Sequence, residues 1–165
     1  MRARPIVQSE ASECGLASLA MVADAHGMRI GLAEMRRRFP LSLKGAKLSH
    51  LIHIAQQLGF ATRPLRLDMD HLGQLKLPCV VHWDLNHFVV LIKVGRSKIT
   101  LLDPAFGEKI FSPSEFSEHF TGIALELTPT AEFKPQRAPS RITVRQLTGP
   151  MRGLGSILFR YATPA

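Results

Sequence analysis

The sequence has no apolar stretch that could cross a membrane, and it has few cysteines. No run approaches the roughly 18 to 20 apolar residues that a membrane-spanning helix needs. The N-terminus has basic residues but not the continuous apolar segment of a signal peptide. Two cysteines are too few for a disulfide framework in a chain of 165 residues. We therefore expect a soluble domain in a reducing cytosol.

The sequence also lacks the pattern of a nucleic-acid-binding protein, although its formal net charge is +8. Residues 1–128 contain 15 Lys and Arg against 12 Asp and Glu, a net of +3, and residues 129–165 contain 6 against 1, a net of +5. Apart from Arg36-Arg37-Arg38, residues 1–128 show no basic stripe and no aromatic residues interleaved with basic ones. We therefore expect no nucleic acid partner. Salt-sensitive binding to DNA that survives removal of residues 129–165 would contradict this expectation.

A change in composition marks a domain boundary near residue 128. The chain is 45% hydrophobic, enough for one ordinary core. From Pro129 onward the chain is rich in Pro, Thr, Ser and Arg and holds five of the eleven prolines. We expect a compact domain over residues 1–128 and a linker with a juxtamembrane stub over residues 129–165. Residues 141–160 are amphipathic and basic, which favours such a stub, and a partly disordered tail is the alternative.

Apolar periodicity predicts helices in the first half of the chain and strands in the second. Residues 12–26 are apolar on nearly every side and stop at Gly27, which indicates a helix buried all round. Further helices are predicted over residues 31–38 and, with one apolar face, over residues 47–59.

Short β-branched and aromatic-rich runs follow, separated by turn residues. The predicted strands cover residues 61–66, 78–83, 87–94, 98–103, 108–111 and 122–127, with a short helix from Pro113 to Phe120 capped by Ser112. Helices first and strands second indicate an α+β fold, with the N-terminal helices packed on an antiparallel sheet.

Cys14 stands where a cysteine could act as a nucleophile. With Ser12 as the N-cap, Cys14 lies in the first turn of the buried helix. The N-terminal end of a helix lowers the pKa of a thiol from about 8.5 to roughly 3.5–7.5, and its free N–H groups can bind an oxyanion. A lone cysteine is more often a small buried hydrophobe, and Cys79, inside the run PCVVHW, fits that alternative.

His87 is the best-placed of the seven histidines to serve as a base. It lies at the turn that opens one strand, and Asp103 ends the next strand before Pro104. Adjacent antiparallel strands would bring the two side chains to the same edge of the sheet, the geometry of a base and the acid that orients it. Asp84 is an alternative acid that could orient His87. His50 and His53 could share one helix face, but no third ligand is spaced near them for a metal site.

Four segments together resemble the bacteriocin-processing cysteine peptidase family. They are Gln8, Glu13-Cys14-Gly15-Leu16-Ala17, Asn86-His87-Phe88-Val89-Val90 and Asp103-Pro104-Ala105. Further segments are similar to the peptidase domains of colicin V-type export transporters: Arg38-Phe39, Gly45-Ala46, residues 55–59 and residues 78–83. The resemblance covers residues 5–128. This sequence departs from the family pattern directly before Cys14, where Glu13 stands in place of the more common Asp.

The resemblance implies a papain-like cysteine peptidase domain that cuts leader peptides after a Gly-Gly pair. Cys14 would be the nucleophile, His87 the general base and acid, Asp103 its orienter and Gln8 an oxyanion donor. The partners implied are a leader-bearing precursor peptide and the transmembrane and nucleotide-binding domains of the same ABC transporter. The domain would lie at the cytoplasmic face of the bacterial inner membrane, without a cofactor or metal of its own, since ATP binds elsewhere in the transporter. The alternative is a domain that binds a peptide cargo without cutting it.

Overall fold

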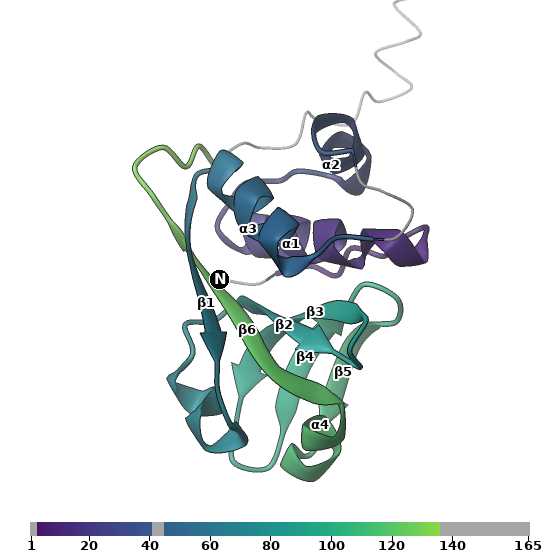
Figure 1. Cartoon of the computed structure of the whole chain (residues 1–165), viewed down its shortest axis with the longest axis vertical. Helices are drawn as coiled ribbons and strands as arrows, with labels where there is room; N and C mark the ends of the chain where they lie inside the picture. Colours follow the sequence, from purple (N-terminus) through teal and green to yellow (C-terminus); the bar gives the residue numbers. More distant parts are fainter. Residues whose placement is uncertain (1–2, 41–44, 136–165) are drawn as a thin grey trace, which may run out of the picture.

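Helices and sheet form separate layers of the molecule (Figure 1). The computed structural model describes residues 3–40 and 45–135. Within these residues, helices α1, α2 and α3 precede a six-stranded antiparallel sheet with the order β1-β6-β2-β3-β4-β5. The predicted α+β arrangement is confirmed.

The three helices follow the apolar pattern of the sequence. Their bounds are Cys14–Ala25 for α1, Leu32–Arg38 for α2 and Leu48–Gln57 for α3. Every residue of α1 except Asp24 is buried, and Gly27, just beyond its end, has a left-handed backbone (φ 93°). Helix α3 buries Leu51, Ile54 and Ala55, so it presents one face to the core.

The start of α1 differs from the prediction, because Ser12 is not its N-cap. Ser12 lies inside a short 3₁₀ helix, η1 (Ala11–Glu13), and Glu13 occupies the N-cap position of α1 without a side-chain capping hydrogen bond. The Glu13 carboxylate accepts the backbone N–H groups of Ser9 and Glu10, which closes this extra turn. Cys14 is therefore the first residue of α1.

The sheet begins earlier and ends later than the sequence pattern indicated. Its strands are β1 (Phe60–Arg66), β2 (Cys79–Trp83), β3 (His87–Val94), β4 (Ile99–Asp103), β5 (Gly107–Phe111) and β6 (Phe120–Pro129). A 3₁₀ helix, η2 (Met69–Gln74), follows β1, and α4 (Pro113–His119) joins β5 to β6. The predicted cap of α4 is confirmed, since Ser112 Oγ accepts the N–H of Glu115 at 3.3 Å.

Both faces of the central strands are buried. Alternate residues point to opposite faces of a strand, and here one face packs on α1 and α3 while the other packs on η2 and α4. The first face includes Val80, Val90, Leu102 and Leu125. The second includes Val81, Val89 and Leu101, which pack in one cluster with Phe116 of α4. This double burial explains why the strand sequences are continuously apolar.

Packing continues beyond the boundary expected near residue 128. Thr130 donates its backbone N–H to the carbonyl oxygen of Gly59 at 2.9 Å. The Phe133 ring lies 4.6 Å from that of Phe60, measured between centroids, and also contacts His26.

The predicted juxtamembrane stub over residues 141–160 lies outside the described residues. In the described part of the chain, no helix combines the length and apolar character that crossing a bilayer requires.

Candidate active site

Cys14, His87 and Asp103 meet where the helical layer contacts the sheet. Cys14 begins α1, His87 begins β3 and Asp103 ends β4. Strands β3 and β4 are antiparallel neighbours, with Val90 opposite Leu102, so the start of one lies beside the end of the other. His87 Nε2 is 2.9 Å from Asp103 Oδ1. The contact expected from the strand order is therefore present.

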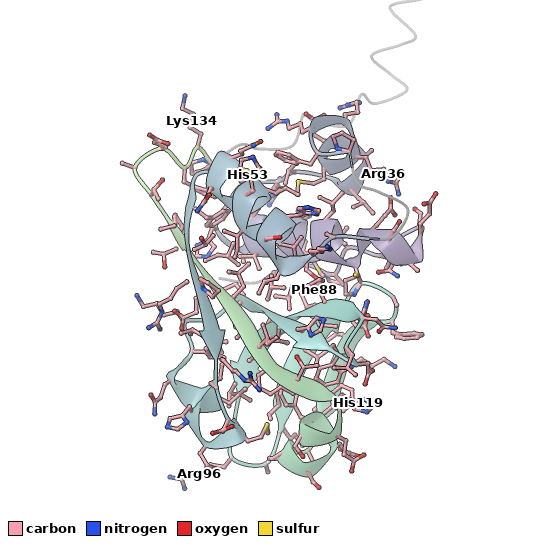
Figure 2. All side chains as sticks on the ribbon, viewed as in Figure 1. Arg36, His53, Phe88, Arg96, His119 and Lys134 are labelled. Carbon is pink, nitrogen blue, oxygen red and sulfur yellow. The ribbon has the colours of Figure 1, made fainter. Side chains whose placement is uncertain are left out.

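A buried serine fixes α1 on β3. Ser18 lies one helical turn after Cys14, is fully buried, and donates its hydroxyl to the carbonyl oxygen of Phe88 at 3.1 Å. Phe88 directly follows His87 and lies where the helical layer meets the sheet (Figure 2). This bond helps to bring Cys14 to His87. Sequence analysis missed it, although one polar residue in the middle of an apolar helix was the available signal.

His87 is cationic at neutral pH. Burial lowers the pKa of His87, but hydrogen bonds and charge interactions with Asp103 and Cys14 outweigh that effect and raise it to about 9. Because Nε2 faces Asp103, Nδ1 is the ring nitrogen that remains for the Cys14 sulfur. The arrangement can hold an imidazolium between the Asp103 carboxylate and the Cys14 sulfur.

Asp103 is held as a carboxylate by its surroundings. Burial raises the pKa of Asp103, but the contact with His87 and the N–H of Ala105, 2.7 Å from Oδ1, bring it below its ordinary value. Asp103 is nevertheless largely buried, with a relative exposure of 7%. It can therefore orient His87 without competing strongly for its proton.

Gln8 is tied to the turn that follows Asp103. Its backbone N–H donates to the carbonyl oxygen of Pro104 at 2.8 Å. Its side-chain Oε1 is buried and has no hydrogen-bond partner among the described residues. Gln8 therefore lies beside the turn that follows Asp103, and its side-chain amide has hydrogen-bonding capacity left.

The turn before His87 has a left-handed backbone at two successive residues that are not glycine. These are Asp84 (φ 45°) and Leu85 (φ 64°). The Asp84 carboxylate contacts His119 Nδ1 at 2.7 Å. The backbone N–H of Asp84 donates to the backbone carbonyl oxygen of His119. Asp84, the rival acid for His87, is thus paired with α4 instead. Leu85 is 82% exposed at the tip of the turn.

The other candidate side chains have different environments. His82 Nδ1 lies 2.9 Å from Thr121 Oγ1, and burial lowers the pKa of His82. His50 and His53 are exposed on α3. Within residues 3–40 and 45–135, no group of three or more His, Cys, Asp or Glu side chains could hold a metal ion. Cys79 is completely buried, and burial raises the pKa of its thiol to about 12.

An open pocket of about 450 Å³ adjoins His87. Ala46, Lys47 and Leu48 line it from the start of α3, and Leu85, Asn86 and Phe88 line it from either side of His87. A peptide in this pocket would therefore run along the start of β3, beside the residues that flank His87.

Comparison with families of known proteins decides the family. Residues 2–132 match the model of the peptidase C39 family. The chain belongs to this family. This C39 domain is 46% identical over 151 residues to two Escherichia coli proteins, the probable microcin-H47 secretion/processing ATP-binding protein MchF and the colicin V secretion/processing ATP-binding protein CvaB. The match covers 91% of the chain but only 22% of either relative.

Solved structures agree with this assignment. The C39 domain matches a double glycine motif protease from an AMS/PCAT transporter, solved in complex with the leader peptide, with a TM-score of 0.74 and 34% identity. That match covers 78% of this chain and 93% of the solved one. The peptidase domain of Streptococcus ComA matches with a TM-score of 0.71 and 26% identity, over 78% and 100% of the two chains. The fold is thus papain-like, as the resemblance implied, and the chain is a peptidase domain.

Proposed function

We propose that this C39 domain is a cysteine endopeptidase that removes leader peptides by cutting after a Gly-Gly pair. The observation that carries the proposal is the chain of contacts from Cys14 to His87 to Asp103 at the junction of α1 with the sheet. Its likeness to a double glycine motif protease supports the substrate class. Exported bacteriocin-like or signalling peptides are the proposed cargo, as the names of the E. coli relatives suggest.

In the proposed reaction, each site residue has one role. The Cys14 thiolate attacks the carbonyl carbon of the second glycine, and the oxyanion that forms accepts hydrogen bonds from N–H groups at the start of α1 and from the Gln8 amide. His87 gives its proton to the leaving amine as the C–N bond breaks, and the leader stays on Cys14 as a thioester. His87 then takes a proton from water, which hydrolyses the thioester and releases the leader. Asp103 keeps the imidazole in position throughout.

The pocket beside His87 is the proposed site for leader residues that precede the cut. Its walls combine apolar groups of Leu48, Leu85 and Phe88 with the amide of Asn86. A Gly-Gly pair has almost no side-chain surface, so a site can recognise it only by excluding Cβ atoms. Contacts with the apolar side chains of this pocket could supply the binding free energy that the glycines lack.

The proposed partners beyond the substrate belong to the same transporter. The chain spans 22% of the E. coli relatives, whose names describe ATP-binding secretion and processing proteins. We propose that transmembrane and nucleotide-binding domains accompany this domain at the cytoplasmic face of the bacterial inner membrane. ATP would then bind outside the peptidase domain.

Incubation with a leader-bearing precursor tests the proposed function. Mass spectrometry is expected to detect two products whose masses sum to the precursor plus one water, with the cut after Gly-Gly. The Cys14→Ala variant should bind the precursor and leave it intact. If the wild-type domain bound the precursor but never cut it, the domain would be a cargo-binding module instead.

A further inference from the structure

Glu13, directly before Cys14, is a buried carboxylate with an unusual set of contacts. Its Oε2 accepts the backbone N–H groups of Ser9 at 2.9 Å and Glu10 at 3.0 Å. The Arg36 guanidinium from α2 donates hydrogen bonds to both carboxylate oxygens. Nη2 lies 2.9 Å from Oε2, and Nε donates to Oε1. The hydrogen bond from Arg36 outweighs burial and lowers the pKa of Glu13. Glu13 is therefore ionised at neutral pH and joins three segments of the chain.

These contacts fix the chain just after Gln8, and the turn after β4 binds Gln8 itself. Ser9 and Glu10 immediately follow Gln8, so the Glu13 carboxylate fixes the chain on the C-terminal side of Gln8. The bond from the Gln8 N–H to the Pro104 carbonyl oxygen fixes Gln8 itself beside the turn after Asp103. The segment is otherwise exposed: Val7, Ser9 and Glu10 all lie at the surface. Without the Glu13 carboxylate, the C-terminal side of Gln8 would lose two hydrogen bonds to the start of α1.

We propose that Glu13 and Arg36 are positioning residues that hold the Gln8 amide at the oxyanion formed on the substrate. The inference rests on the proposed peptidase activity, because it assigns a task to Gln8 in that reaction. Neither Glu13 nor Arg36 touches the substrate. Arg36 lies on α2 at the edge of the helical layer (Figure 2) and fixes the carboxylate, which in turn fixes the backbone after Gln8.

A positioning role of this kind changes kcat and leaves KM nearly unchanged. An oxyanion donor acts in the transition state, and losing one lowers kcat by roughly 10²- to 10³-fold. A displacement of such a donor by about 1 Å costs up to about 10²-fold. Glu13→Ala is thus expected to lower kcat by about 10- to 100-fold, and Glu13→Asp, which keeps a carboxylate, should recover most of that loss.

A double-mutant cycle with Gln8 separates this role from a general structural one. The proteins compared are the wild type, Gln8→Ala, Glu13→Ala and the double variant, each assayed for cleavage of the same precursor and normalised to reactive Cys14. If Glu13 acts through Gln8, the double variant should have the kcat of Gln8→Ala alone, because the amide that Glu13 positions is already gone. Additive losses in kcat would overturn the inference.

Glu126 in β6 supplies a matched control. It is also a buried carboxylate that pairs with an arginine, Arg63, and accepts a backbone N–H, that of Lys76. It lies opposite Cys79, at the end of β2 away from His87. Glu126→Ala should lower the stability but leave kcat and KM of the folded protein unchanged.

Arg36→Met tests the same role if Glu13→Ala does not fold, since the Arg36 side chain is 43% exposed and its replacement disturbs the core little. It should lower kcat in the wild-type background and have no further effect in the Gln8→Ala background. Normal cleavage by both Glu13→Ala and Arg36→Met would overturn this inference alone. A wild-type domain that fails to cut the precursor would overturn the proposed function and this inference with it.

Discussion

At the scale of single residues, the two cysteines are both buried but have different neighbours. Cys79 is completely buried in β2, and the pKa of its thiol, raised to about 12, leaves on the order of one thiol in 10⁵ ionised at pH 7. Cys14 begins a helix and interacts with the His87 imidazole. We predict that iodoacetamide alkylates Cys14 much faster than Cys79 in the folded domain, measured by peptide mass spectrometry at pH 7.

The Cys14→Ala variant provides the control, because it contains Cys79 alone and should react slowly until it is unfolded. In urea both cysteines of the wild type should react at similar rates. Equal rates in the folded wild type would contradict the assignment of Cys14 as the nucleophile.

The charge on His87 predicts the alkaline limit of activity. The pKa of His87 is raised to about 9, so the imidazolium is present below that pH and is lost as the pH rises through it. kcat/KM is therefore expected to fall above about pH 9. Asp103→Asn removes a charge that raises this pKa, so the decline should begin at a lower pH, with partial activity remaining at neutral pH.

Asp84→Asn makes the same chemical change at the acid that contacts His119. Its pH profile should match that of the wild type. If Asp84→Asn moved the alkaline limb and Asp103→Asn did not, the acid that orients His87 would have been assigned wrongly.

At the scale of elements, Gly59 joins the end of α3 to the last described segment of the chain. Its φ is 86°, and a Cβ placed there would lie 2.7 Å from the Phe133 Cα. The left-handed backbone alone costs a residue with a Cβ about 1–2 kcal/mol, and the contact with the Phe133 backbone adds to this. We predict that Gly59→Ala lowers the free energy of unfolding by at least that amount, as measured by urea denaturation.

Gly73→Ala in η2 is the matched control, since a Cβ at Gly73 meets nothing within 4 Å. Its free energy of unfolding should change by less than about 0.5 kcal/mol. Equal stabilities of the two variants would mean that neither the left-handed backbone at Gly59 nor the contact with Phe133 restricts a side chain there in solution.

At the scale of the whole molecule, the candidate site is assembled from both layers. The helical layer contributes Cys14, and the sheet contributes His87 and Asp103. The pocket beside them is likewise lined by the start of α3 and the turn before β3. Peptide recognition is therefore expected to divide into two parts, with the scissile bond at the junction and the leader in the pocket.

This division predicts different effects for two kinds of substrate change. Replacing either glycine of the Gly-Gly pair by alanine should lower kcat/KM sharply while leader affinity changes little, because the added Cβ obstructs only the reacting segment. Replacing an apolar leader residue should instead weaken binding to the Cys14→Ala domain, measured by calorimetry. A short peptide ending in Gly-Gly that is cut as efficiently as the full leader would contradict the prediction.

The sequence by itself determined the four α-helices and the six strands of the described residues, and the meeting of His87 with Asp103. These features depend on local information: apolar periodicity sets each element, and the short connection Gly95-Arg96-Ser97 makes β3 and β4 antiparallel neighbours, which places the start of one beside the end of the other. The buried helix 12–26 was predicted for the same reason, although its first turn was not.

Only the tertiary structure decided which polar groups pair across the fold. Ser18 bonds to Phe88, Glu13 binds Arg36, and Asp84 contacts His119 rather than the nearby His87. Strand β1 likewise pairs with β6, from the far end of the described chain. A hydrogen-bonding group takes whichever partner packing brings within about 3 Å, and nearness along the chain does not fix that choice. The physical reason is that apolar periodicity determines whether a segment forms a helix or a strand, whereas the packing of distant segments against each other determines its tertiary contacts.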